Sequence, residues 1–89
     1  MKLKFTAQSL KDLYRLKEFI AKKNAIAATK YIDRLLKAIR QLLSQPKLGK
    51  SLEEEPLARQ LVVGDYIVRY AIRGETIYIL KIWHGKEDW

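Results

Sequence analysis

The last third of the chain limits the possible folds most, because it contains three short runs of strand-forming residues separated by two-residue turns. The runs are 59–63, 66–73 and 76–83, rich in β-branched and aromatic residues or alternating in polarity. Gly64-Asp65 and Gly74-Glu75 separate them, and glycine supplies the positive φ that tight hairpin turns require. This pattern predicts three consecutive antiparallel strands.

The third run is unusual because both of its faces are largely apolar, which is typical of a central strand covered on both sides or partly covered by a partner. Strict alternation divides its side chains into two sets, with Ile77, Ile79, Lys81 and Trp83 on one face and Tyr78, Leu80 and Ile82 on the other.

The first half of the chain predicts a short strand and a helical hairpin. Residues 2–5 alternate in polarity, with Leu3 and Phe5 on one face. Apolar residues at helical spacing predict a helix over 7–22, capped by Thr6, and a second over about 25–44. Asn24 separates the two helices, and Pro46 with Gly49 ends the second. Helices joined so closely are antiparallel neighbours.

The predicted order is therefore β-α-α-β-β-β, an α+β fold in which the helical hairpin covers one face of a small antiparallel sheet. The hairpin is the only cover available for that sheet. With 89 residues and no visible repeat or linker, the chain forms one domain, residues 1–89.

Charge is distributed unevenly along the chain, which carries a formal net charge of +8. Residues 1–50 hold 13 Lys or Arg against 3 Asp or Glu, and residues 51–89 hold 5 against 7. The excess is therefore expected on the helices rather than on the sheet. It favours a polyanion or an acidic protein segment as partner, and the alternative is a solvated, lysine-rich helix face. The loop 51–56, with its run Glu53-Glu54-Glu55, is expected to be solvated.

Several classes of protein are disfavoured by composition. The chain has no cysteine and one histidine, so we expect neither disulfides, nor a structural metal, nor a cofactor. The apolar runs are far shorter than the roughly 20 residues that span a bilayer, and no signal peptide is visible. These features suit a cytoplasmic protein without a membrane partner.

A group of recognition residues is expected where the predicted strands end. Arginine, tryptophan and histidine side chains are suited to nucleic acid or to an acidic partner, and the group consists of Arg59, Arg69, Arg73, Trp83 and His84. Structural roles are the alternative, because Trp83 can pack on the helices and Arg69 can pair with Asp65 or the glutamate run.

Five segments together carry a resemblance to a known family. They are Phe5-Thr6, Pro46-Lys47-Leu48-Gly49, Arg59-Gln60-Leu61-Val62-Val63, Tyr66-Ile67-Val68-Arg69-Tyr70 and Ile82-Trp83-His84-Gly85. In this order and spacing the chain resembles the RelE/ParE superfamily of bacterial type II toxins, and it is most similar to the ParE branch.

The resemblance implies a toxin held inactive by a cognate antitoxin in a hetero-oligomer. ParE-like members, associated with plasmid stabilisation, poison DNA gyrase, whereas RelE-like members cut messenger RNA on the ribosome. We expect gyrase poisoning, without catalysis, through Arg59, Arg69, Arg73, Trp83 and His84. A homologue that has lost its toxicity is a third possibility. Apolar residues left over on the sheet and the basic hairpin suggest an antitoxin surface that includes Leu3, Leu13 and Tyr14.

The alternative, ribosome-dependent RNA cleavage, needs a cation, an acid or base, and a carboxylate. Arg69, His84 and Glu54 supply these groups. Two features count against it. RelE-type nucleases usually place a tyrosine at the C-terminal end, and this tail has none; its Glu87 and Asp88 would also repel RNA.

Overall fold

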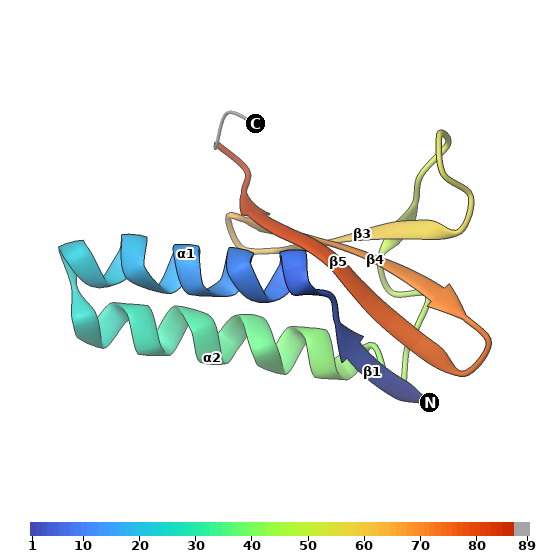
Figure 1. Ribbon diagram of the computed structural model, residues 1–89, viewed down its shortest axis with the longest axis horizontal. Helices are drawn as coiled ribbons and strands as arrows, with labels where there is room; N and C mark the ends of the chain where they lie inside the picture. The colour runs from blue at the N-terminus through green and yellow to red at the C-terminus, as the bar shows by residue number, and fades with distance from the viewer. Residues whose placement is uncertain (87–89) are drawn as a thin grey trace.

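Two antiparallel helices form one layer of the molecule and a twisted sheet forms the other (Figure 1). The structure, a computed structural model, describes residues 1–86. In chain order the elements are β1 Lys2–Phe5, α1 Ala7–Lys23, α2 Ala25–Gln41, β2 Lys50–Ser51, β3 Ala58–Val63, β4 Tyr66–Arg73 and β5 Thr76–His84. The α+β architecture and the helical hairpin are thereby confirmed.

The sheet has five strands in the order β1-β5-β4-β3-β2. The three C-terminal strands pair antiparallel, as predicted, and β2 pairs antiparallel with β3. β1 is parallel to β5, with Leu3 opposite Ile77 and Phe5 opposite Ile79, so the sheet is mixed rather than purely antiparallel. β5 is therefore an interior strand, as its two apolar faces indicated.

The hydrophobic core lies between the hairpin and one face of the sheet. Its buried side chains come from both layers and are Leu16, Leu35, Ile39, Leu42, Leu61, Val63, Val68, Tyr70, Ile77, Ile79 and Ile82. The opposite face of the sheet is covered by no described helix, and its side chains on β4 and β5 are half-buried or exposed. One face of the sheet is thus available to a partner.

A β-bulge in β5 changes which residues face the core. Arg69 is opposite Lys81, but Tyr70 is opposite Ile79, so Leu80 has no partner on β4. The extra residue shifts the alternation by one position, and Ile82 is buried together with Ile79. Strict alternation was therefore wrong beyond Ile79: Ile82 faces the core, whereas Lys81 and Trp83 face away from it.

Side chains of α1 replace a neighbouring strand along the part of β5 that β1 does not reach. Thr6 caps α1 by accepting the Ser9 N–H, as predicted, and its hydroxyl also lies 2.9 Å from the carbonyl oxygen of Ile79. Asp12, 1 % exposed, accepts the Ile82 N–H at 2.9 Å through Oδ2. Arg15 donates to the Ile82 carbonyl at 3.4 Å. The helix thus satisfies backbone groups of the bulged segment.

The second helix ends earlier than predicted, at Gln41 rather than near residue 44. Residues 42–44 form tight turns in which Leu42, Leu43 and Ser44 each donate to the carbonyl three residues before. Leu42 still reaches the core, so the apolar spacing continues after the helix has ended. The predicted loop 51–56 also begins with a residue of β2, which was not predicted.

Tyr70 fixes the loop between α2 and β2. Its buried hydroxyl donates to the Pro46 carbonyl at 2.7 Å and accepts the Gly49 N–H at 2.9 Å. A Cβ at Gly49 would lie 2.7 Å from the Gln60 carbonyl oxygen, so this approach requires glycine. Burial raises the pKa of Tyr70 above its ordinary value of 10.0, although the Gly49 N–H and Arg59 oppose the rise.

Tyr70→Phe is expected to lower the free energy of unfolding at pH 7 by about 1–2 kcal/mol, because two buried backbone groups lose their partner. Since the folded-state pKa of Tyr70 is raised, its contribution is complete below pH 10.0 and is lost as the pH rises from there through the folded-state pKa. Urea unfolding between pH 7 and 11 should therefore show a shallower alkaline decline for Tyr70→Phe than for the exposed control Tyr14→Phe. Equal declines would contradict this account.

Candidate partner-binding surfaces

The sheet register divides the predicted recognition residues between two faces. Residues opposite each other on paired strands share a face, so Arg69, Arg73 and Trp83 lie on the face away from the helices. We call this the open face; its residues on β3, β4 and β5 are Ala58, Gln60, Val62, Ile67, Arg69, Ala71, Arg73, Thr76, Tyr78, Leu80, Lys81 and Trp83. Arg59 and His84 lie on the helix side.

Trp83 is the centre of a compact cluster on the open face. The Arg69 guanidinium carbon lies 5.3 Å from the centroid of the Trp83 ring, and the Lys81 Nζ lies 5.8 Å from it. Both distances are within the range of cation–π attraction. Arg69 also donates to the Gln60 side chain at 2.7 Å, rather than to the glutamate run or Asp65. Trp83 therefore does not pack on the helices.

The strands are more strongly cationic than the sequence halves suggested. The five strands contain seven Lys or Arg and no Asp or Glu, because the acidic residues of the described C-terminal half lie in loops and turns. Counting charged residues separately for 1–50 and 51–89 therefore gave a wrong prediction, that the positive excess lies on the helices rather than on the sheet. One line across four strands consists of Lys50, Gln60, Arg69 and Lys81. Like charges directly opposite, as in Arg69 and Lys81, repel each other, and a bound anion would relieve that repulsion.

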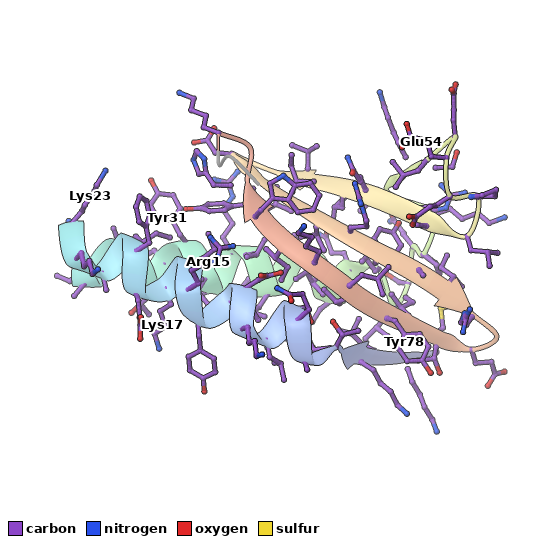
Figure 2. All side chains as sticks on the ribbon, turned by 45° about the horizontal axis from the view of Figure 1, so that its top comes forward. Arg15, Lys17, Lys23, Tyr31, Glu54 and Tyr78 are labelled. Carbon is purple, nitrogen blue, oxygen red and sulfur yellow. The ribbon has the colours of Figure 1, made fainter. Side chains whose placement is uncertain are left out.

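Arg73 lies away from the tryptophan cluster. It is four residues from Arg69 along β4, roughly 13 Å at the usual rise of a strand. Its neighbour is a groove of about 570 Å³ on the open face, between the loop before β3 and strands β4 and β5. The groove is lined by Glu54, Glu55, Pro56, Leu57, Ala58, Ala71, Arg73, Tyr78 and Leu80. In Figure 2, Glu54 projects from that loop at one end of the sheet.

Arg59 and His84 have partners on the helix side, at opposite ends of the core. Arg59 is opposite Tyr70 and donates to the Gly49 carbonyl at 2.7 Å, so it stabilises the loop before β2. His84 contacts Tyr66 edge-to-face, with ring centroids 5.3 Å apart, and its Nδ1 accepts the Lys86 N–H at 3.1 Å. The five predicted residues therefore form no single cluster.

The three residues predicted for the alternative, RNA cleavage, are not brought together either. Arg69 faces the open side, His84 lies beside Tyr66 on the helix side, and Glu54 lines the groove with Arg73. Within residues 1–86, no group of three or more His, Cys, Asp or Glu is placed to hold a metal ion. Glu87 and Asp88 of the tail lie outside the described residues.

A second groove, of about 830 Å³, runs between α2 and the edge of the sheet. We call it the helix-edge groove. Arg34 and Lys37 of α2 form one wall, and Leu48 to Leu52 form the other. β2 pairs only with Arg59 and Gln60, so the rest of β3, residues 61–63, has no second strand beside it in the described chain. The groove thus combines a basic wall with an available strand edge.

The three predicted antitoxin residues occupy different environments. Leu3 and Leu13 are half-buried and pack against the core, so much of their apolar surface contributes to the fold itself. Tyr14 is 71 % exposed on the outer side of α1. Only Tyr14 offers most of its side chain to a partner.

Sequence reasoning missed several residues of these surfaces. Lys81 and Gln60 join the tryptophan cluster because of the bulge and the β3 register, neither of which the sequence pattern reveals. Leu57, 66 % exposed beside the glutamate run, was also missed, because a single exposed leucine is common and only the neighbouring groove makes it notable.

Among the described helices, none is long and apolar enough to cross a membrane.

Comparison with known proteins identifies relatives that match nearly the whole chain. Two relatives from Caulobacter vibrioides (strain ATCC 19089 / CIP 103742 / CB 15) are Toxin RelE1, 26 % identical over 93 % of this chain and 91 % of its own, and Toxin RelE2, 29 % identical over 91 % of each chain.

A solved structure described as the chromosomal ParDE TA system from P. aeruginosa has the same fold. Its TM-score is 0.81, with 21 % identity over 94 % of this chain and 95 % of the other. The family model for the ParE toxin of the type II toxin-antitoxin system parDE matches residues 3–89. The chain therefore belongs to the ParE toxin family, within the RelE/ParE superfamily of type II toxins.

Proposed function

We propose that this toxin inhibits growth by poisoning DNA gyrase and that it contacts gyrase through the open face. The observation that supports this most is the cluster of Arg69, Lys81 and Trp83 on a sheet face that the described chain leaves uncovered. Tryptophan and arginine are the residue types that most often dominate protein–protein binding energy.

The separation of Arg69, His84 and Glu54 supports gyrase binding over RNA cleavage. Acid–base catalysis needs its groups within hydrogen-bond reach of the same reacting atoms. Arg69 and His84 are on opposite faces of the sheet, and the Nδ1 atom of His84 already accepts a backbone N–H. Binding to gyrase does not require these three side chains to lie close together.

Induction of the chain without its antitoxin tests the target. Gyrase poisoning should produce a DNA-damage response with gyrase-linked DNA breaks. Rapid translation arrest with cut messages would instead show the RelE-like activity, and the absence of any growth effect would show that toxicity has been lost.

Ribosome-dependent cleavage remains the second candidate because seven strand cations suit a polyanion. His84 distinguishes the two functions. If the toxin acts on gyrase, His84→Ala should change growth inhibition only modestly, whereas a nuclease would lose activity by orders of magnitude. Measuring message cleavage and growth with the same variant separates these cases.

We propose that a cognate antitoxin neutralises the toxin in a cytoplasmic hetero-oligomer and uses the helix-edge groove. An extended segment of the antitoxin can pair with the uncovered edge of β3, and acidic side chains on it can meet Arg34 and Lys37. The exposed ring of Tyr14 offers a separate contact on α1. Type II membership supports an antitoxin partner, and the basic wall and strand edge of the groove suit an acidic extended segment.

Arg34→Glu combined with Lys37→Glu should weaken antitoxin binding by about tenfold or more at low salt, because two attractive charges become repulsive. The loss should shrink as the salt concentration rises, since salt screens exposed charges. Affinity can be measured by calorimetry at several salt concentrations. Lys22→Glu, on an exposed lysine near the far end of α1, is the control and should bind normally. A similar loss for both variants would indicate a general charge effect instead.

A further inference from the structure

The groove on the open face is hollow because small residues lie at its floor. Ala58 is opposite Ala71, and Ala71 is opposite Tyr78, so two of three adjacent strands carry only a methyl group at this level. Arg73 and Leu80 lie on either side of that level, and Leu57 projects at the rim with 66 % of its surface exposed. Leu57 and the lining of the hollow thus form one apolar surface at this end of the sheet.

The wall of the groove is held in place by the backbone. The Ala58 N–H donates to the Glu55 carbonyl at 2.9 Å, and the Leu52 N–H donates to the Ala58 carbonyl at 3.2 Å. These bonds close the loop that carries Glu54 to Leu57 onto the start of β3. A groove that exists before binding costs less conformational entropy when it is filled.

The lining residues favour a protein segment over nucleic acid. The floor and rim are mainly apolar, and they offer few polar groups to a base edge or a phosphate. Glu54 and Glu55 on one wall would repel a phosphate backbone. Arg73 also lines the groove and can pair with a single carboxylate, whereas a continuous run of phosphates would also have to pass the glutamates.

We infer that this groove is the apolar anchor site for the toxin's protein target, which inserts two neighbouring apolar side chains flanked by an acidic residue that pairs with Arg73. A volume of about 570 Å³ leaves room for more than one side chain. This inference rests on the proposed function, because it locates the contact within the open face. The groove lies away from the helix-edge groove, so filling it should leave antitoxin binding intact.

Filling the groove tests the inference. Ala71→Phe adds an aromatic ring on the open face, outside the core, and should reduce binding of the toxin to purified DNA gyrase by about tenfold or more, with a parallel loss of growth inhibition. Its melting temperature and its affinity for the antitoxin should match those of the wild type. Leu57→Ala, which removes the rim without adding bulk, should show the same selective loss. Leu43→Ala, an exposed leucine that lines neither of the two grooves, should not.

Each result has a defined meaning. Full toxicity and gyrase binding of both groove variants would overturn the inference, and so would loss of antitoxin binding by these variants. If Ala71→Phe fails to fold, the inference is tested by comparing gyrase binding and growth inhibition of Leu57→Ala with those of Leu43→Ala. If the wild type arrests growth without binding gyrase, the proposed target is wrong. The anchor site is then tested by growth alone: it is supported if the groove variants lose growth inhibition and contradicted if they keep it.

Discussion

Replacing Asp12 with alanine is expected to lower the free energy of unfolding by about 3 kcal/mol, because a buried N–H loses a charged acceptor. Asp12 is 1 % exposed, and its Oδ2 accepts the Ile82 N–H just beyond the bulge of β5. Its Oδ1 accepts from Gln8 at 2.9 Å and lies 3.7 Å from Arg15. A loss of this size is a large share of the stability of a small domain. Urea unfolding followed by circular dichroism measures it.

Two further variants identify the cause of that loss. Asp33→Ala removes an exposed aspartate of α2 and should change stability by less than about 0.5 kcal/mol. Asp12→Asn keeps an oxygen that can accept the Ile82 N–H, so it should retain part of what alanine loses. If Asp12→Ala were as stable as the wild type, α1 would not be supporting the bulged segment of β5.

Trp83→Ala should reduce growth inhibition and target binding by about thirtyfold or more, the effect typical of a tryptophan at the centre of an interface. The ring lies on the open face beside Arg69 and Lys81 and outside the core, so the fold should persist. Its removal eliminates the flat surface and also leaves the two cations without their π partner. Binding to purified gyrase and growth after induction measure the loss.

The matched control for Trp83 is Tyr14→Ala, which removes an exposed aromatic ring from the helical layer. We expect this variant to weaken antitoxin binding and to leave toxicity unchanged, whereas Trp83→Ala should do the reverse. Loss of both activities in either variant would mean that the antitoxin and the target share one surface.

The elements of the fold were predictable because their signals are local. Helical spacing marked the hairpin, with α1 confirmed to within one residue at its end. Glycines at 64 and 74, with φ of 61° and 58°, marked the hairpin turns between β3, β4 and β5. Helical spacing and turn glycines are read from residues close together in sequence, so recognising them does not require knowledge of the tertiary arrangement.

The arrangement of the surfaces depended on non-local pairing and could not be predicted. Leu80 has no partner on β4, and nothing in the sequence near it distinguishes a bulge from a regular strand. That one residue decides that Trp83 faces outward. Arg59 and Arg69 both looked like recognition residues, yet the register places them on opposite faces, and Arg59 holds the Gly49 carbonyl. The register between β3 and β4 determines which face each arginine occupies, and no local sequence pattern reveals that register.

The parallel pairing of β1 with β5 joins the earliest and the latest strands of the described chain. During synthesis, residues 2–5 cannot pair, and Asp12 and Arg15 of α1 cannot bond the Ile82 backbone, until β5 has emerged from the ribosome. Contacts so distant in sequence slow folding. A nascent chain should therefore complete its sheet, and with it the open face, only after residues 76–84 have left the ribosome.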